Sequence, residues 1–303
     1  MTGSRFVVES AGTRALVDCG LFQGYKHLRQ RNREPFPIPP GSLDAVLVTH
    51  AHIDHSGYLP ALVRDGYAGP ILATKGTAEL CSLLLPGSAY LMEEEATHAK
   101  KKGYSKHKNP ERIYTSEDAD RALTRFELVD RDTPYDVAKG IKATWHPAGH
   151  IIGAASIGVE TAVGTVFFSG DLGTSNDALL QPPRPYPGSD ILVVESTYGD
   201  RSHGDTKAED QLAKILKPVL DNGGVVVIPA FAVGRTQTLM LHISRLIKAG
   251  RIPEVPVFVN SQWQRMRRRF ILATRRNKES HSRNLKKCIP AHDSCAVLSS
   301  RWL

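Results

Sequence analysis

Residues 50–55 read HAHIDH, and this stretch decides how the chain of 303 residues is best interpreted. It closely follows the apolar run AVLV, which is typical of a buried strand. Imidazole and carboxylate groups are ligands that zinc and similar divalent ions prefer. Such a concentration at one strand end predicts a metal site better than a solvated polar loop. A tight loop would aim His50 and His52 at one metal, and Asp54 and His55 at a second.

Two more candidate ligands lie downstream, each after a strand-like run and next to small residues. His150 follows the sequence PAG, and Asp171 lies within FFSGDLG at residues 167–173. Small neighbours let the backbone approach a metal closely. A carboxylate at Asp171 could bridge two metals, with a hydroxide held between them as nucleophile. The predicted metal ligands are His50, His52, Asp54, His55, His150 and Asp171.

The succession HAHIDHSG, AGH and SGDLG resembles the metallo-β-lactamase superfamily. The resemblance implies an α/β fold, the αββα sandwich of that superfamily. Residues 17–20, VDCG, are similar to its early strand end, where the aspartate, here Asp18, supports the metal loop through hydrogen bonds without binding metal. The ligand types suit two Zn²⁺ ions as cofactors, and Mn²⁺ could use the same groups.

A narrower resemblance concerns two later stretches. Residues 193–201, VVESTYGDR, and residues 228–237, IPAFAVGRTQ, resemble signatures of the β-CASP branch, whose members are zinc-dependent nucleases acting on RNA and in some cases on DNA. The similarity covers residues 2 to about 261. It implies that Glu195 is an acidic residue that supports the metals or handles protons, so that Asp54 and Glu195 are the predicted catalytic residues. The alternative for Glu195 is a carboxylate that only caps a strand end.

We therefore expect three parts in the chain. Residues 1–196 form the metallo-β-lactamase domain, residues 197–261 form the first part of an inserted β-CASP α/β cap domain, and residues 262–303 form a disordered or frameshifted basic tail. The sandwich is expected to be incomplete, and at the amino end either one edge strand is missing or the start codon is misassigned. Expected strands are Arg5–Glu9, Arg14–Val17, Ala45–Val48, Ile71–Ala73, Ile141–Trp145, Ala155–Glu160, Val166–Ser169, Ile191–Val194, Val225–Ile228 and Val255–Val259. Expected helices are Tyr58–Arg64, Thr77–Leu85, Ala89–Lys101, Ser116–Leu123, Ala208–Asp221 and Thr236–Ala249.

The family pattern is lost abruptly at Gln262. The resemblance implies Ser-Pro-Met-Ala after the run VPVFVN, whereas this chain reads Ser261-Gln262-Trp263-Gln264. Loss of one cytosine from CCA ATG GCA G gives CAA TGG CAG, which encodes Gln-Trp-Gln. We hypothesise that the chain from Gln262 onward is a frameshifted tail of a truncated gene product, which a DNA trace would test. The family's late proton-donating histidine and one further metal-binding histidine would then be missing, and activity would be reduced.

Charge is distributed unevenly along the chain. Residues 262–303 hold eleven Lys and Arg against two acidic residues, a net charge of +9, whereas the whole chain has +8. Residues 1–261 therefore sum to −1, and the basic character belongs to the tail. The arginine cluster at residues 265–269 could attach to RNA, but a basic peptide without a selected partner explains the same charge run.

Composition limits the remaining possibilities. With 41% hydrophobic residues the chain can bury a core, and no apolar run is long enough to span a membrane. The four cysteines form no recognisable disulfide framework, which favours a cytoplasmic location. The resemblance implies a single-stranded RNA substrate and is compatible with a homodimer. Alternatives are a small-molecule hydrolase of the thioesterase or lactonase type, and an inactive metal-binding remnant that holds RNA through its tail.

Overall fold

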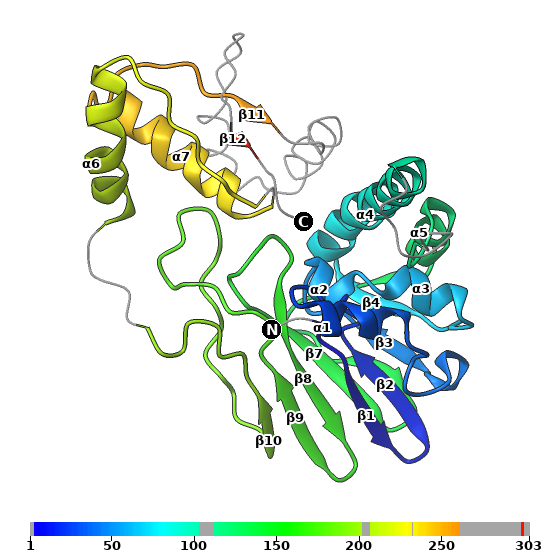
Figure 1. The fold of residues 1–303 in the computed structure, drawn as a ribbon. Coiled ribbons are helices and arrows are strands. Elements are labelled where there is room, and N and C mark those ends of the chain that lie inside the picture. The colour runs from blue at the N-terminus through cyan, green and yellow to red at the C-terminus, as the bar shows by residue number, and fades with distance from the viewer. Residues whose placement is uncertain (1–2, 103–111, 202–206, 232, 261–297, 300–303) are drawn as a thin grey trace. The chain divides into compact units, whose positions relative to one another are not determined.

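The computed structural model describes residues 3–102, 112–201, 207–231, 233–260 and 298–299 (Figure 1). The chain divides into two compact units, Met1–Thr197 and Tyr198–Leu303, which are described separately. The predicted three-part division stays a prediction, because most of the tail, including Cys288 and Cys295, lies outside the described residues. Among the described residues, no helix combines the length and apolarity that crossing a membrane requires.

The first unit contains two five-stranded sheets. The first sheet has the order β1-β2-β3-β4-β5, in which β1 and β2 are antiparallel and the other pairs are parallel. Its strands are β1 (Phe6–Ser10), β2 (Thr13–Val17), β3 (Ala45–Leu47), β4 (Ile71–Thr74) and β5 (Phe126–Val129). Every residue of β3 and β4 is buried, as expected for parallel strands covered on both faces.

The second sheet has the order β10-β9-β8-β7-β6 and is antiparallel except for the parallel pair of β9 and β10. Its strands are β6 (Tyr135–Ala138), β7 (Ile141–Pro147), β8 (Ala155–Thr161), β9 (Gly164–Phe168) and β10 (Ile191–Val193). In β7 the buried residues Ile141, Ala143 and Trp145 alternate with more exposed ones, so one face of this sheet is directed at a core.

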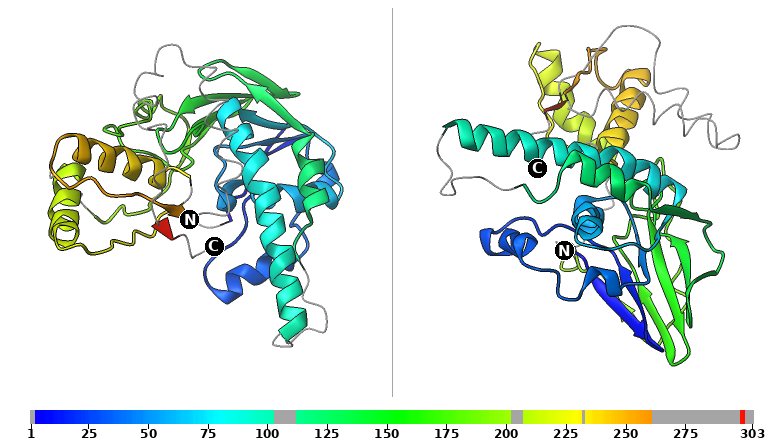
Figure 2. Two further views of the ribbon diagram at one scale, coloured as in Figure 1. Left: turned by 90° about the horizontal axis from the view of Figure 1, so that it is seen from above. Right: turned by 90° about the vertical axis from the view of Figure 1, so that its right-hand side faces the viewer.

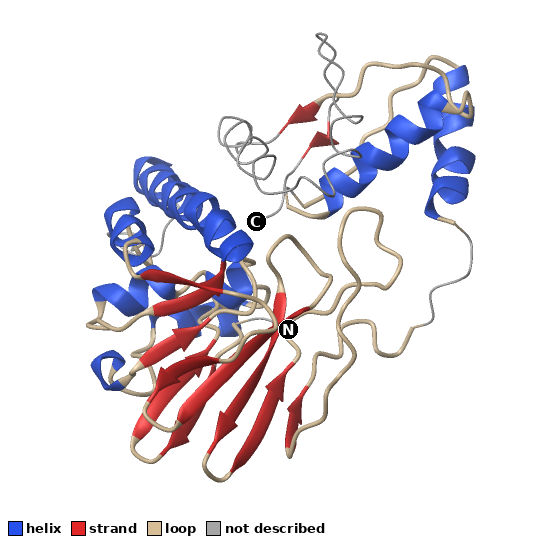
Figure 3. Ribbon diagram, turned by 180° about the vertical axis from the view of Figure 1, so that it is seen from behind, coloured by secondary structure: helices blue, strands red, loops and turns tan. Residues whose placement is uncertain are grey.

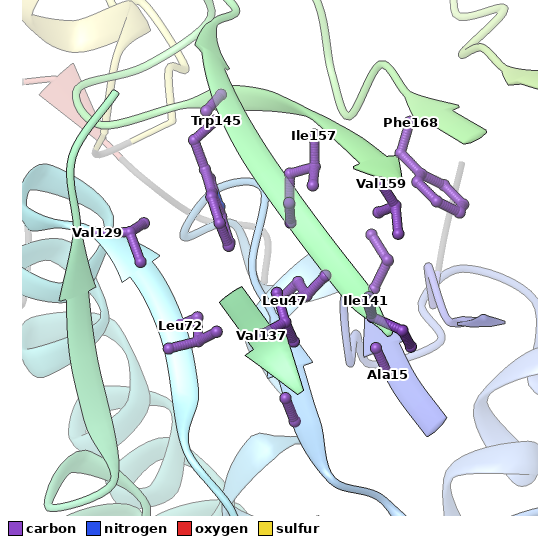
Figure 4. Packing of buried hydrophobic residues seen from close by; sticks show 14 residues of the cluster. Ala15, Leu47, Leu72, Val129, Val137, Ile141, Trp145, Ile157, Val159 and Phe168 are labelled. Atoms are coloured by element: carbon purple, nitrogen blue, oxygen red, sulfur yellow. The ribbon is translucent and has the colours of Figure 1, made fainter. Parts of the chain in front are cut away.

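The core lies between the two sheets (Figure 4). Leu47 and Leu72 of the first sheet pack with Ile157 and Trp145 of the second. The Trp145 indole is fully buried, and its Nε1 donates a hydrogen bond to the carbonyl oxygen of Val48, 3.2 Å away. This bond satisfies the indole and fixes the chain just before the HAHIDH stretch.

The helices of the first unit lie with the first sheet (Figures 2 and 3). They are α1 (Lys26–Gln30), α2 (Ile53–Ser56), α3 (Leu59–Arg64), α4 (Lys75–Lys102) and α5 (Ser116–Leu123), with short 3₁₀ turns at Arg31–Arg33 and Pro40–Ser42. Layers of helix and paired sheets agree with the predicted α/β sandwich.

Helix α4 corrects the prediction of two separate helices over this stretch. It continues through Pro86, whose ring removes a backbone hydrogen bond from the helix interior. Cys81, Leu85 and Ala89 are fully buried at a four-residue spacing, so they form one stripe against the core. Burial of this continuous stripe outweighs the lost hydrogen bond.

Several other element predictions were wrong. Strands β5 and β6 and helix α1 were missed, and a short helix, α2, replaces the expected tight loop. In β5 only Val129 is buried, so its pattern is weak, and pairing with β4 is what recruits it. Residues 225–228 are not a strand, and of residues 255–259 only the last is. Val225 and Val227 are 81% and 57% exposed, and residues 225–228 pair with no strand in the described part of the chain.

The second unit contains α6 (Ala208–Asp221), α7 (Arg235–Lys248), β11 (Val259–Asn260) and β12 (Leu298–Ser299), the two strands pairing in parallel. The two helices enclose a small apolar cluster. Its buried members are Ala213, Leu216, Ile243, Leu246 and Ile252.

Candidate metal centre

Three imidazole nitrogens and one carboxylate converge at the ends of three strands. His52 Nδ1 lies 3.1 Å from His50 Nε2 and also 3.1 Å from His150 Nε2. Asp171 Oδ2 lies 3.7 Å from His50 Nε2 and 3.6 Å from His150 Nε2. His50 and His52 follow β3, His150 follows β7, and Asp171 follows β9, so four ligand atoms from distant parts of the sequence lie within 4.8 Å of one another.

The spacing of these atoms fits a tetrahedral ion. Zinc–nitrogen bonds of about 2.0–2.1 Å imply ligand atoms separated by about 3.3 Å along a tetrahedron edge. A neutral imidazole carries a single ring proton, so the Nδ1 of His52 cannot make good hydrogen bonds to two other ring nitrogens at once. A cation between these atoms would instead accept the lone pairs of all three nitrogens as metal ligands. The residues therefore fit a metal ion.

The histidines of this group are electrically suited to bind a cation. Burial, followed by the neighbouring histidines, lowers the pKa of His50 well below its usual range. Burial, together with His150, lowers the pKa of His52 to about 4, and burial also lowers the pKa of His150. All three rings are therefore neutral near pH 7, and their lone pairs are available to a metal.

A second group shares Asp171. His55 Nε2 lies 3.2 Å from Asp171 Oδ1 and 4.0 Å from Asp54 Oδ2. Despite the short distance to Asp171, this buried nitrogen makes no aligned hydrogen bond with any described residue. An unsatisfied buried ring nitrogen facing two carboxylates fits a second metal ion, which Asp171 could share with the first.

The protonation of this second group differs from that of the three-histidine group. Burial alone would lower the pKa of His55, but the carboxylates of Asp18 and Asp171 outweigh it and raise the pKa to about 10. Burial would likewise raise the pKa of Asp171, but its contact with His55 holds that pKa below the ordinary value. Burial raises the pKa of Asp54. In the metal-free chain, the positive charge of protonated His55 therefore balances the negative charge of the neighbouring carboxylates.

The buried carboxylate of Asp18 supports the histidine loop through hydrogen bonds. Its Oδ1 accepts hydrogen bonds from the Thr49 backbone nitrogen and hydroxyl at 2.8 and 2.9 Å. Its Oδ2 lies 2.7 Å from His55 Nδ1 and accepts a hydrogen bond from the Ser4 hydroxyl at 3.2 Å. The backbone at Asp18 is left-handed, with φ of 58°. This is the supporting arrangement that the family resemblance implies, because it leaves His55 Nε2 facing the other carboxylates.

Two glycines allow the ligand loops to touch. A Cβ on Gly20 would lie 1.6 Å from the carbonyl oxygen of Asp54, and a Cβ on Gly173 would lie 1.8 Å from that of Gly149. The Gly173 nitrogen donates to the carbonyl oxygen of Ala148 at 2.8 Å. Only glycine permits these contacts. The Asp18–Gly20 segment can therefore pack directly on the backbone of Asp54, and the Asp171 loop on the backbone before His150.

Glu195 contacts the Asp171 loop and is not part of the four-atom cluster. Its Oε1 accepts a hydrogen bond from the Leu172 nitrogen at 2.7 Å, and its Oε2 accepts one from the Thr197 nitrogen at 3.3 Å. Its own nitrogen donates to the Ser169 hydroxyl at 3.0 Å. These contacts brace the turn that carries Asp171, and a catalytic role for Glu195 stays a prediction.

Sequence reasoning missed the role of Arg184. This residue lies in the proline-rich connector at residues 181–189, and its backbone nitrogen donates to the carbonyl oxygen of Pro147 at 2.8 Å. Its guanidinium donates to Asp132 Oδ2 at 2.8 Å, and His146 Nδ1 lies 3.2 Å from Asp132 Oδ1. The Arg184 contact holds the pKa of Asp132 below its usual range. These contacts hold the connector beside the loop that carries His150. In the sequence, only the four prolines of residues 181–189 indicated that this segment is rigid.

The histidines late in the sequence do not join this centre. His242 belongs to the second unit, where its Nδ1 lies 3.1 Å from Glu209 Oε1. His203, His281 and His292 lie outside the described residues. Cys19 and Cys81 are buried free thiols, and burial raises the pKa of each to about 12.

Comparisons with known proteins agree with this architecture. The model of the metallo-β-lactamase superfamily matches residues 3–218. Ribonuclease TTHA0252 from Thermus thermophilus is 33% identical over 262 residues, which cover 86% of this chain and 56% of that protein. Transcription termination factor FttA from Methanosarcina mazei is 33% identical over 269 residues, which cover 86% of this chain and 40% of that protein. These relatives are β-CASP proteins, so the predicted resemblance is confirmed.

The extent of these matches is limited. The chain spans about half the length of the curated relatives, 56% of the ribonuclease and 40% of the termination factor. Among solved structures, the metallo-β-lactamase fold protein YhfI from Bacillus subtilis shows a TM-score of 0.35 and 16% identity over 59% of this chain and 58% of that chain. The assignment rests on the sequence matches and not on that structural similarity. The chain belongs to the metallo-β-lactamase superfamily.

Proposed function

We propose that this chain is a metal-dependent hydrolase of RNA phosphodiester bonds that holds two zinc ions. The observation that carries the proposal is the convergence of three neutral imidazole nitrogens and the Asp171 carboxylate within 4.8 Å. The second ion would be held by Asp54, His55 and Asp171, where the His55 Nε2 lacks an aligned partner among the described residues. Mn²⁺ could occupy the same sites.

When bound, the ions would supply Lewis acidity and a nucleophile at neutral pH. The protein's own contribution is orientation. Asp18 fixes the His55 ring through Nδ1, and Glu195 holds the Asp171 turn through the Leu172 nitrogen. Glu195 lies close enough to that turn to move a proton at its Oε2 during the reaction, and Asp54 would act as ligand and as an acidic group beside the phosphate.

The substrate class is proposed from the relatives. A protein named as a ribonuclease and proteins named as transcription termination factors are each about one-third identical to this chain over most of its length. Single-stranded RNA is the proposed substrate, as the family resemblance of the sequence implies. The cytoplasmic location and homodimer predicted from the sequence stay predictions.

The test begins with metal content per chain, measured by inductively coupled plasma mass spectrometry on the purified full chain. We expect about two zinc ions and the loss of one in His55→Ala. His98→Ala is the matched control, because His98 is an exposed histidine of α4 and is not a proposed ligand. Failure to retain any metal, or equal loss in both variants, would exclude the proposed centre.

Activity is then tested on end-labelled RNA, with a thioester and a lactone as competing substrates. We expect RNA cleavage that chelation abolishes and zinc restores. Labels at the 5′ and 3′ ends distinguish internal cutting from cutting at an end. Turnover of the thioester or lactone without cleavage of RNA would favour the small-molecule hydrolase instead.

A further inference from the structure

Residues 22–33 form an exposed projection that we call the basic lobe (the short blue helix in the right-hand view of Figure 2). Its two ends are tied together by Asn32, whose side chain is buried. The Phe22 nitrogen donates to Asn32 Oδ1, and Asn32 Nδ2 donates to the Phe22 carbonyl oxygen, both at 2.8 Å. These paired hydrogen bonds fix the two ends of the lobe against each other, and the side chains of the residues between them are mostly exposed.

The lobe carries an unusual excess of positive charge. Lys26, Arg29, Arg31 and Arg33 are all exposed, and no acidic residue occurs between Asp18 and Glu34. None of the four cations forms an ion pair with a described residue. The other residues of 1–261 carry a net charge of −5, because the whole stretch sums to −1 and the four lobe cations contribute +4. Four clustered cations without ion pairs, in an otherwise acidic stretch, favour an anionic ligand.

An aromatic pair lies among these cations. The Tyr25 ring is stacked on the His27 ring, with centroids 5.8 Å apart and planes inclined by 11°. Tyr25 is 76% exposed, so the outer face of its ring is open to solvent. Proteins that bind single-stranded nucleic acids combine an exposed aromatic ring with surrounding cations. The ring stacks on a base, and the cations pair with phosphates.

The lobe is attached directly to the ligand loop. The Leu21 nitrogen, just before the lobe, donates to the Ile53 carbonyl oxygen at 2.9 Å, next to Asp54. Arg5 supports the base, because its Nε and a terminal nitrogen donate to the Gly20 carbonyl oxygen at 2.9 and 2.8 Å. The Arg5 guanidinium also lies over the Phe22 ring, 4.9 Å from its centroid. The base of the lobe is therefore bonded to the segment that carries the proposed ligand Asp54.

We propose that the basic lobe binds the unpaired nucleotides of an RNA strand beside the bond to be cleaved. A base stacks on Tyr25, and phosphates pair with Lys26, Arg29 and Arg33. Arg31, whose guanidinium lies 4.3 Å from the Phe22 ring centroid, supports the lobe instead. The placement of the RNA beside the metals rests on the proposed function. The lobe's affinity for a single strand does not depend on hydrolysis.

Binding is measured by fluorescence anisotropy of a labelled 2′-O-methyl phosphorothioate RNA of about 12 nucleotides, which resists hydrolysis. With the full chain, we expect Tyr25→Ala to weaken binding about tenfold. Arg29→Ala with Arg33→Ala should weaken binding further and reduce the salt-dependence slope by about 1.4, or about 0.7 for each lost phosphate contact. All three residues are exposed, and unchanged circular dichroism checks the fold.

Matched controls separate the lobe from other surfaces. Tyr90→Ala removes an exposed tyrosine of α4, and Lys139→Ala removes an exposed cation in the turn between β6 and β7. Neither should change the affinity. A combined Arg267→Ala, Arg268→Ala and Arg269→Ala variant tests the tail. If this variant loses binding while the lobe variants bind like the parent, the lobe proposal is overturned.

Hydrolysis of bis(p-nitrophenyl) phosphate separates this inference from the proposed function. The compound is too small to span the lobe and the metals, so Tyr25→Ala should keep the parent kcat/KM. No hydrolysis by the parent, together with lobe-dependent RNA binding, would reject the phosphodiesterase and support the lobe. Normal hydrolysis with RNA binding insensitive to Tyr25, Arg29 and Arg33 would reject the lobe alone.

Discussion

The Oδ2 of Asp18 lies 2.7 Å from the Nδ1 of His55, and this contact decides which side of the imidazole faces the other carboxylates. A ring held through Nδ1 can present only Nε2 to a metal. Since Asp18 also binds the Thr49 backbone nitrogen, one buried carboxylate fixes both the start and the end of the HAHIDH stretch.

Replacement of Asp18 tests this control directly. Asp18→Asn should lower zinc affinity at the second site about 10- to 100-fold, because an amide no longer selects the same ring orientation. Competition with a chromophoric chelator measures the loss. Asp190→Asn is the matched control, because Asp190 accepts hydrogen bonds from Thr165 near the opposite end of β9. Equal affinities for the Asp18 variant and the parent would contradict the supporting role.

Metal binding should release a proton from the second site only. With a pKa of about 10, His55 is protonated at pH 7 in the metal-free chain, whereas His52, with a pKa of about 4, is not. Zinc titration by calorimetry in two buffers of different ionisation enthalpy should show about one proton released. The release should disappear in His55→Ala; an unchanged release in that variant would assign the proton elsewhere.

The same pKa gives a stability prediction for the metal-free chain. The folded pKa of His55 lies above the ordinary value of about 6.5, so the charged ring stabilises the fold fully below that pH. This contribution is lost as the pH rises through about 10. Urea unfolding in a chelator between pH 6 and pH 10 should therefore show a decline that His55→Ala lacks. Parallel declines in both proteins would contradict the assignment.

Gly20→Ala should be strongly destabilising. The added Cβ would lie 1.6 Å from the Asp54 carbonyl oxygen, so either the early loop or the ligand helix must shift. A loss of about 3 kcal/mol in the free energy of unfolding is expected, with reduced metal content. Gly41→Ala is the control, because its added Cβ would lie at an ordinary 3.5 Å from the nearest atom. Similar denaturation midpoints for the two variants would refute the close approach.

Two substitutions of Glu195 separate bracing from proton handling. A glutamine can still accept the Leu172 hydrogen bond through its one carbonyl oxygen and loses only the longer one from Thr197, so Glu195→Gln should retain the full metal content. If the carboxylate also moves a proton, as proposed, kcat for RNA cleavage should fall about 100-fold or more in that variant. Glu195→Ala should lose metal as well. A glutamine variant with the parent rate would leave Glu195 only its bracing role.

Arg184→Ala tests the connector. Removing the guanidinium breaks its ion pair with Asp132 and loosens the segment beside the His150 loop. Zinc affinity at the three-histidine site should fall about tenfold, within the usual range for residues that position ligands. Lys142→Ala, which breaks an ion pair with Asp136 at the other end of β7, should have no effect. The opposite ranking of these two variants would contradict the positioning role.

Sequence patterns predicted the parts of the fold whose signals are local. The apolar runs at β3, β4, β7, β8 and β9 appear as strands, and the groups predicted at their ends lie together around His52. Short elements with mixed patterns, such as β5, were missed because pairing with a neighbour and not local burial determines them. The Asp132–Arg184 contact joins residues 52 positions apart, and no local pattern indicates it.

All six candidate ligands come from residues 50–171, within the unit Met1–Thr197. The residues that orient them, Asp18, Gly20, Gly173 and Glu195, belong to the same unit. The proposed ligands and the residues that support them therefore form a set that does not depend on any side chain of the second unit. Mutations confined to the second unit would leave every proposed ligand and its supporting contacts chemically unchanged, so the two units could accumulate substitutions at different rates.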